Sequence, residues 1–274
     1  MAIIDEARQD FPVSVICREL GVARSRYYAW RHEPPRQAPA RLLDQVKQIH
    51  AQTRHSYGSR RMAAALCQNG VVVGRHRART LMRQAGVHAL YPRPRYRRAD
   101  HVGAVAPNHL NRQFQPTRPD YTWAGDITYV ATAVGWLYVA IVMDLFARRI
   151  IGWACSRRPD TDLVVTALDR AWQARGKPAE VMFHSDQGVQ YTSTEFTKYL
   201  RERRFVRSMS RGGNCWDNAV VERFFRSLKS EGLVEHLADP ARAEHAVDDY
   251  VIFYNTERLH SSLGYATPVS ADRN

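Results

Sequence analysis

Hydrophobic residues in the second half of the chain first follow the pattern of strands. Three runs, at 122–131, 135–146 and 148–156, are continuously apolar or alternate between apolar and polar residues. Short connections separate the runs, so they predict three successive strands that pair as an antiparallel meander.

After these runs, predicted helices alternate with predicted strands. Residues 161–176 and 195–204 carry apolar residues at helical spacing, whereas 179–188 and 205–210 predict short strands. A loop then leads into a last long amphipathic segment at 216–232, which predicts a helix. The predicted order βββαβαβα is that of an α/β fold with a mixed sheet.

The first half of the chain has a helical pattern broken by glycines. In residues 12–31 a short helix precedes Gly21 and a second helix follows it, and residues 57–86 repeat this arrangement around Gly70 and Gly74. Both segments therefore predict helix-turn-helix units. Short helices joined by glycine turns also occur in proteins that never contact DNA, so the pattern alone leaves both interpretations open.

Charge favours the DNA-binding interpretation. The 274-residue chain has 40 Lys plus Arg and 27 Asp plus Glu, a net charge of +13, and 45% hydrophobic residues, which exclude a fully disordered chain. Residues 1–115 hold 20 basic and 7 acidic residues, whereas 116–274 hold 20 of each. The whole excess of positive charge, 20 − 7 = 13, lies in the first part of the chain, which indicates that this part binds nucleic acid.

Other features exclude several classes of protein. The most apolar stretch, 134–147, is shorter than the roughly 20 residues of a membrane span and contains Asp144. The N-terminus lacks the basic and apolar regions of a secretory signal, so a cytoplasmic protein is expected. The cysteines form no C-x-x-C pair and predict neither disulfides nor a zinc site. They are Cys17, Cys67, Cys155 and Cys215.

These patterns divide the chain into four expected segments. Residues 1–35 form a helix-turn-helix-like segment and 36–98 a second DNA-binding domain. Residues 99–119 are expected to be an extended linker, because they carry few periodic apolar positions and follow a basic, proline-broken stretch. Residues 120–274 are expected to be the α/β domain with a C-terminal helical extension.

Three acidic residues of the α/β domain are candidates for a metal site. Asp126 lies in the middle of the first predicted strand, between apolar neighbours, where an acid is disfavoured unless it has a partner. Asp186 closes the fourth predicted strand, and Glu222 lies on the polar face of the last helix. Asp144 competes for the first position and Glu231 for the third.

The spacing and the surrounding motifs resemble a known family. Between Asp186 and Glu222 lie 222 − 186 − 1 = 35 residues. Together with WAGDITYV around Asp126, HSDQGVQYTS, SRGGNCWDNAVVERFFRSLKSE and YNTERLHSSLGYATP, this resembles the DDE catalytic domain of retroviral integrases and insertion-sequence transposases. The resemblance is closer to the OrfB product of insertion sequences and covers nearly the whole chain. No acidic position departs from the pattern.

The resemblance implies a fold and a chemistry. It implies an RNase H-like catalytic domain preceded by a small all-α helix-turn-helix region. Catalysis would use two Mg²⁺ ions, with Mn²⁺ as a substitute, where Asp126 bridges both ions while Asp186 and Glu222 each complete one site. Water would cleave one strand, and the freed 3′-hydroxyl would then attack DNA.

The resemblance also implies partners. Handling two element ends requires at least a homodimer acting on double-stranded DNA, and members of the family are often fused to an upstream OrfA product. No membrane partner is expected, and the protein would act in the bacterial cytoplasm at the nucleoid. A retroviral integrase itself is disfavoured, because the His/Cys zinc module of those enzymes has no counterpart in this sequence.

Basic residues of both halves are candidates for DNA contacts, and Arg258 and His260 near the C-terminus are possible additions. The main candidates are Arg24, Arg26, Arg60, Arg61, Arg75, Arg77, Arg79, Arg95, Arg97, Arg98, Arg226 and Lys229. Two other functions remain open: an RNase H-like nuclease that cleaves without joining, and a DNA-binding regulator whose α/β domain has no catalytic activity.

Overall fold

The computed structural model describes most of the chain, which divides into two compact units. The units are residues 1–45 and 46–274. The described residues are 1–32, 38–90, 105–212, 214–233 and 237–273. No helix among them has the length and apolarity needed to cross a membrane.

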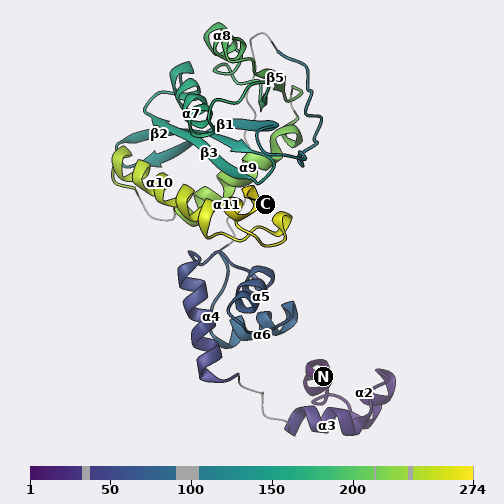
Figure 1. Ribbon diagram of the computed structural model, residues 1–274. Helices are drawn as coiled ribbons and strands as arrows, with labels where there is room; N and C mark the ends of the chain where they lie inside the picture. Colours follow the sequence, from purple (N-terminus) through teal and green to yellow (C-terminus); the bar gives the residue numbers. More distant parts are fainter. Residues whose placement is uncertain (33–37, 91–104, 213, 234–236, 274) are drawn as a thin grey trace. The chain divides into compact units, whose positions relative to one another are not determined.

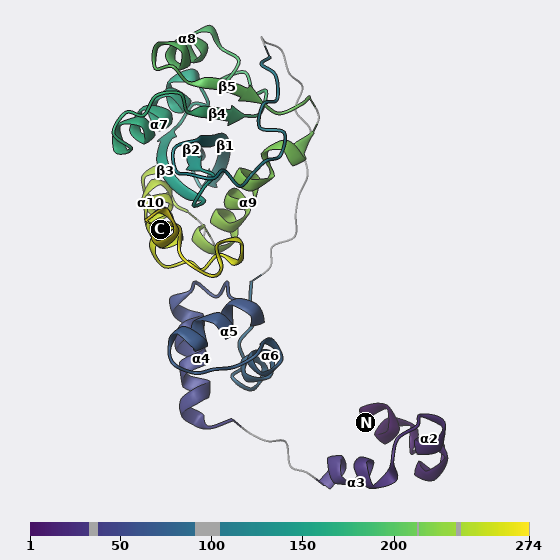
Figure 2. The ribbon, with the colours of Figure 1, turned by 45° about the vertical axis from the view of Figure 1, so that its right-hand side comes forward.

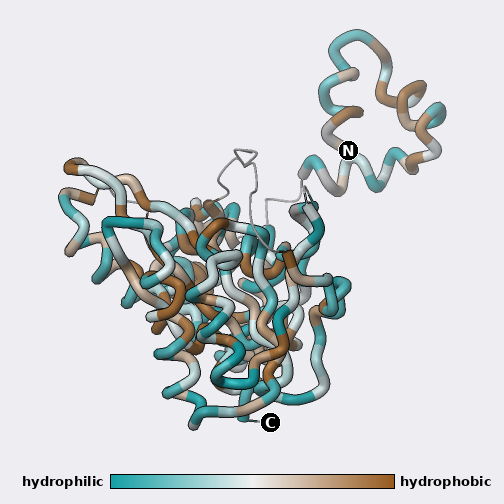
Figure 3. The backbone as a smooth tube through the Cα atoms, turned by 90° about the horizontal axis from the view of Figure 1, so that it is seen from above, coloured by the Kyte–Doolittle hydropathy of each residue, from teal (hydrophilic) through white to brown (hydrophobic). Residues whose placement is uncertain are grey.

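The N-terminal unit contains the first predicted helix-turn-helix. Its helices are α1 (Ala2–Ala7), α2 (Val13–Glu19) and α3 (Arg24–His32). The chain turns between α2 and α3 at Gly21, whose φ of 62° is unfavourable for residues with a side chain. In Figure 3 these helices alternate between hydrophilic and hydrophobic residues, as expected for short amphipathic helices around a small core. That core consists of Ile4, Ile16, Cys17 and Tyr27.

The second predicted helix-turn-helix is also present. Its helices are α5 (Ser59–Gln68) and α6 (Arg75–Gln84), and they are preceded by α4 (Ala40–Gln52). Gly70 ends α5 with a φ of 82°, which gives the turn its left-handed residue. Sequence analysis did not predict α1 or α4.

A five-stranded sheet forms the centre of the α/β domain. Its strands are β1 (Thr122–Thr132), β2 (Gly135–Asp144), β3 (Arg149–Ser156), β4 (Met182–Ser185) and β5 (Val206–Met209). The order in the sheet is β3-β2-β1-β4-β5. The pairs β1–β2 and β2–β3 are antiparallel, which confirms the predicted meander, while β1–β4 and β4–β5 are parallel.

Helices cover both faces of the sheet. They are α7 (Thr161–Ala174), α8 (Thr194–Glu202), α9 (Ala219–Ser227), α10 (Pro240–Thr256) and α11 (Pro268–Asp272), with short helical turns at Cys215–Asn218, Leu228–Gly232 and Ser261–Leu263. Helices α7 and α8 lie on one face, and α9 and α10 on the other (Figures 1 and 2). The observed order β1-β2-β3-α7-β4-α8-β5-α9 confirms the predicted α/β fold.

Local sequence explains where several of these helices begin. Asp160, Ser193 and Asp239 each precede a helix and accept a hydrogen bond from the backbone N–H three residues on. Pro240 follows Asp239 as the first residue of α10, where its missing N–H costs nothing. Two hydrophobic clusters then anchor the helices, one on each face of the sheet.

Part of the stretch expected to be a linker packs onto the α/β domain. Leu110 is 3% exposed and belongs to the cluster under α9 and α10. The backbone N–H groups of His109 and Leu110 donate to the Ser208 hydroxyl at 3.0 and 3.1 Å. Residues 105–114, which we call the strap, therefore lie along β5, while 91–104 are outside the described residues.

Candidate active site

Asp126 and Asp186 lie at the same level of the sheet. In the parallel pair β1–β4, Ala124 is opposite His184, and each aspartate follows its paired residue by two positions. Neighbouring strands are about 4.8 Å apart, and residues two positions apart share a face of the strand. The register therefore brings Asp126 beside Asp186, which directly follows the end of β4.

Helix α9 brings Glu222 to this edge. Asn218, just before α9, is buried and donates from Nδ2 to the Gly125 carbonyl at 3.4 Å, next to Asp126. A side chain at Gly125 would lie 2.6 Å from the Phe183 ring, so glycine is required there. Glu222 follows Asn218 by four residues, about one helical turn, and shares its face of the helix.

The three carboxylates act on one another electrostatically. Burial and then the charge of Asp186 raise the pKa of Asp126 well above its usual value. Burial likewise raises the pKa of Glu222; Arg226 opposes this shift and Asp186 adds to it. Converging carboxylates favour a cation between them. Their hard oxygens are the ligands that Mg²⁺ prefers.

The carboxylates are neighbours without forming a closed ligand shell. Asp126 accepts a hydrogen bond from its neighbour Ile127 N–H at 2.8 Å, and Asp186 from the Gly188 N–H at 2.9 Å. Within the described ranges, no three His, Cys, Asp or Glu side chains lie close enough to hold one metal ion. The donor chemistry fits a divalent cation, and the side chains would have to move closer to bind it.

Asp144, the first competitor, is held by buried structural contacts. Its antiparallel pairing with Trp123 places it on the face of the sheet opposite to Asp126. It is fully buried and accepts hydrogen bonds from the backbone N–H groups of Asp120 and Phe146, both at 2.9 Å. Burial raises its pKa to about 6, and Arg175 lies 3.4 Å away. These contacts hold Asp144 away from the candidate site of Asp126, Asp186 and Glu222.

Glu231, the second competitor, is held in a buried ion pair. Arg258 donates to its two carboxylate oxygens from Nε and Nη2, both at 2.7 Å, and the Tyr250 hydroxyl donates at 2.9 Å. The prediction that Arg258 and His260 contact DNA is wrong, because these residues are only 3% and 7% exposed. Arg258 contacts Glu231 within the π-helical turn Leu228–Gly232 that continues α9, and the His260 ring packs against Tyr254.

Asp217 is a site residue that sequence analysis missed. It is fully buried, and its carboxylate accepts hydrogen bonds from Arg112 Nε at 2.8 Å and Asn108 Nδ2 at 2.9 Å, both on the strap. Arg211 adds Nε and Nη2 donors, both at 2.8 Å. These Arg211 contacts come first among the causes that hold the Asp217 pKa below its usual range. Asp217 thus fixes the strap to the start of α9, and its place in the motif NCWDN was the available signal.

The basic residues near Glu222 are exposed. Arg226 lies one turn further along α9. The Lys229 ammonium lies 4.6 Å from the centre of the Tyr129 ring. Burial lowers the pKa of Lys229 while Asp126 raises it, so its charge reaches the carboxylate site.

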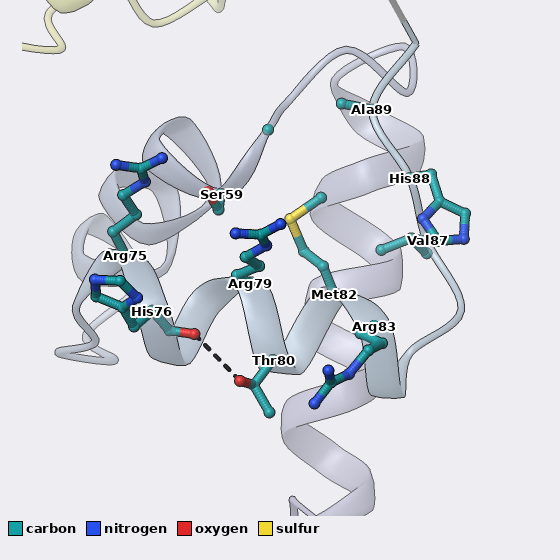
Figure 4. A pocket seen from close by; sticks show the side chains of 11 residues that line it. Ser59, Arg75, His76, Arg79, Thr80, Met82, Arg83, Val87, His88 and Ala89 are labelled. Atoms are coloured by element: carbon teal, nitrogen blue, oxygen red, sulfur yellow. Dashed lines mark hydrogen bonds between the residues drawn. The ribbon is translucent and has the colours of Figure 1, made fainter. Parts of the chain in front are cut away.

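The basic residues of the helical segments are mostly exposed too. Arg24 and Arg26 are exposed on α3, and Arg61 on α5 is half-buried. Arg60, Arg75, Arg77 and Arg79 are exposed as well. Arg75, Arg79 and Arg83 project from successive turns of α6 and line one pocket with Ser59 and His88 (Figure 4). The predicted contacts Arg95, Arg97 and Arg98 lie outside the described residues.

Two buried histidines should make the stability of the fold sensitive to acid. Burial lowers the pKa of His184 to about 4 and that of His260 to about 3, so both are neutral in the folded protein. The unfolded chain takes up protons below pH 6.5, so the free energy of unfolding should fall by about 2 kcal/mol per histidine between pH 7 and 5. Urea unfolding of the wild type and of His184→Gln at both pH values measures this difference.

The matched control for this experiment is His76→Gln, since His76 is exposed. We expect the control to keep the wild-type difference in the free energy of unfolding between pH 7 and 5. In His184→Gln, about half of the contribution that His184 and His260 make to this difference should be lost. A His184→Gln protein with an unchanged difference would show that His184 is not a source of the acid sensitivity.

Family profiles match most of the chain. Residues 37–95 match a profile described as an HTH-like domain. Residues 116–215 and 204–268 match two profiles, each described as an integrase core domain. The second helical segment and the α/β domain therefore both have recognised relatives.

Whole proteins of insertion elements are similar along nearly their full length. An uncharacterised 31 kDa protein of insertion element IS600 from Shigella sonnei is 38% identical over 263 residues, covering 93% of this chain and 96% of its own. The putative transposase InsK of IS150 from Escherichia coli (strain K12) is 34% identical, covering 98% and 96%.

A solved structure agrees on the fold. The simian T-cell lymphotropic virus intasome in complex with the PP2A regulatory subunit B56 gamma is similar, with a TM-score of 0.50 and 16% identity over 84% of this chain and 74% of that one. The mixed sheet and its helices have the RNase H-like arrangement of integrase cores. The chain belongs to the family of insertion-sequence transposases with an integrase core domain, and is thus a DNA transposase.

Proposed function

We propose that the protein is a DDE transposase that binds the ends of its insertion sequence, cleaves a DNA strand and joins the resulting 3′-hydroxyl to target DNA. The catalytic residues are Asp126, Asp186 and Glu222. One observation carries this proposal: the β1–β4 register sets the two aspartates side by side, and α9 is hydrogen-bonded to β1 beside Asp126, one turn before Glu222.

The same three residues would hold two Mg²⁺ ions, for which Mn²⁺ would substitute. Bound at this edge, the two ions would activate the attacking oxygen and stabilise the leaving oxygen of an in-line displacement. Burial, together with the charge of Asp186, raises the pKa values of both Asp126 and Glu222. This supports a cation site, since carboxylates that disfavour each other's charge gain most from a cation. Asp126 would be a ligand of both ions, while Asp186 and Glu222 would each complete one site.

The chain's own groups hold and orient these carboxylates. Asn218 fixes the start of α9 to β1, and Asp217 fixes the same segment to the strap. Lys229 contributes positive charge near Asp126 and contacts the DNA end. Cleavage by water and attack by the 3′-hydroxyl are both in-line displacements, so a single arrangement serves both.

The exposed basic residues of α3, α5, α6 and α9 bind double-stranded DNA, together with Arg95, Arg97 and Arg98. Contacts to phosphates give affinity and fix the register of the protein on the duplex, whereas the sequence is read by contacts to base edges, which are fewer. Because two ends must be handled together, the protein acts as a homodimer or a larger oligomer. An OrfA-type product joins it or is fused to it, and the complex works at the bacterial nucleoid in the cytoplasm.

A joining assay tests the proposed function. The protein is mixed with a pre-nicked duplex from the end of its element, a supercoiled plasmid and Mg²⁺ or Mn²⁺. We expect covalent joining of the duplex to the plasmid, and none with EDTA in place of the metal. Cleaved but unjoined DNA would favour a nuclease, and binding without any metal-dependent product would favour a regulator.

A further inference from the structure

Four arginines line one pocket in the unit of residues 46–274. Arg60 and Arg61 come from α5, Arg75 from the start of α6, and Arg223 from α9. The wall is completed by Ser56, Gly58, Ser59, Ser261 and Tyr265. As far as the structure describes the chain, no carboxylate lines this arginine pocket.

Buried contacts within the unit hold its walls together. Tyr57, just before α5, is 1% exposed, and its hydroxyl accepts a hydrogen bond from the Leu259 N–H at 2.8 Å. Tyr265 has a left-handed φ of 66°, unusual for a residue with a side chain, and its N–H donates to the His260 carbonyl at 2.8 Å. This tight turn fixes the position of Tyr265 in the pocket wall.

The positive charge of the arginine pocket is not neutralised. None of its four arginines forms an ion pair with any carboxylate of the described ranges. Burial and then the charge of Arg258 lower the pKa of Arg61, and Arg223 lowers it further. Glu231, the acid that acts on Arg61, already binds Arg258 through both oxygens. Gathering like charges is unfavourable, and an anionic ligand would offset that cost.

The arginine pocket connects the DNA-binding helices with the catalytic helix. It shares Gly58, Ser59 and Arg75 with the basic pocket of Figure 4, which continues along α6 through Arg79 and Arg83. At its other end, Arg223 directly follows Glu222 in the sequence. Positive side chains therefore form one path from α6 to the helix that carries the candidate catalytic glutamate.

We propose that the arginine pocket binds a backbone phosphate of the element-end duplex, between the segment held by α6 and the strand that reaches Glu222. Planar guanidinium groups and the Ser59 and Ser261 hydroxyls are suited to phosphate oxygens. A phosphate held at a fixed place between α6 and Glu222 would set the distance between the DNA sequence that is recognised and the bond that is cleaved. This inference rests on the proposed function, because it requires the duplex that the transposase processes.

The test replaces two exposed members of the pocket, as Arg60→Gln with Arg223→Gln. The matched control is Arg201→Gln on α8, another exposed arginine and one that lines no part of the pocket. Affinity for an element-end duplex is measured over a range of salt concentrations. The loss of one phosphate contact should reduce the slope of log K against log salt by about 1 in the double variant and leave the control at the wild-type slope.

A second readout is the position of the joined bond, determined by sequencing the junctions. The double variant should scatter the junctions over neighbouring nucleotides, whereas the control should keep one position. Unchanged melting temperatures establish that both proteins fold. A wild-type slope together with wild-type junctions in the double variant would overturn the proposal.

A lower slope on a random-sequence duplex but not on the element end would assign the pocket to target DNA and equally overturn it. Failure of the proposed function gives a different result. If the wild type joined no DNA, the junction readout would be lost, while the salt slope on the element-end duplex would still report whether the pocket binds phosphate.

Discussion

Replacing Asp126 by Asn is expected to reduce joining of element ends by at least about 1,000-fold. The substitution keeps the size of the side chain and removes the negative charge that the proposed metal site requires. Asp186→Asn and Glu222→Gln should have effects of the same order, because the proposed site needs all three carboxylates together. The rate of joined product from the pre-nicked duplex, with saturating Mg²⁺, measures the loss.

DNA binding separates a lost active site from a lost fold. All three variants should bind the element-end duplex within about twofold of the wild type, since removing a negative charge does not weaken contacts to phosphate. Asp162→Asn serves as the matched control, because Asp162 is an exposed acid at the start of α7, outside the candidate site. If one of the three variants kept most of its joining rate, that residue would be removed from the site.

The largest loss of stability is expected from Arg258→Ala. The substitution leaves the Glu231 carboxylate buried, with the Tyr250 hydroxyl at 2.9 Å as its remaining side-chain donor. Removing one partner of a buried ion pair costs about 3–5 kcal/mol. Urea unfolding at pH 7 measures the free energy of unfolding of both proteins.

The control is Lys198→Ala in α8, where Lys198 and Glu202 form a 3.8 Å ion pair whose side chains are 65% and 53% exposed. An exposed pair of this kind contributes less than about 1 kcal/mol. A similarly small loss in Arg258→Ala would mean that water reaches Glu231, and the buried pair would then have no structural importance.

The sequence predicted the fold well where the signal is local. The alternation of residues 122–156 was sufficient for the meander of β1, β2 and β3, and the pattern of 161–232 for the helices and strands that follow. Helix α4 was not predicted, although Val46, Ile49 and His50 lie at helical spacing on its buried face.

The candidate site was predicted only in part. Motif spacing selected Asp126, Asp186 and Glu222, and the structure shows how the β1–β4 register and α9 bring them to one edge. The environments of the other acids depend on distant partners. Asp217 accepts hydrogen bonds from Arg112, 105 residues away, and Glu231 from Arg258, 27 residues away.

By itself the sequence determined the order of helices and strands in the α/β domain, the basic first half and the family, because periodicity, charge and motifs are properties of short stretches. Only the tertiary structure decided which acids meet at the candidate site and which are buried in ion pairs or hydrogen-bond clusters elsewhere. It also decided that Arg258 lies in the core while Arg223 joins Arg61 in a pocket. The burial and charge partners of a side chain depend on segments that meet only after folding, and no local pattern encodes them.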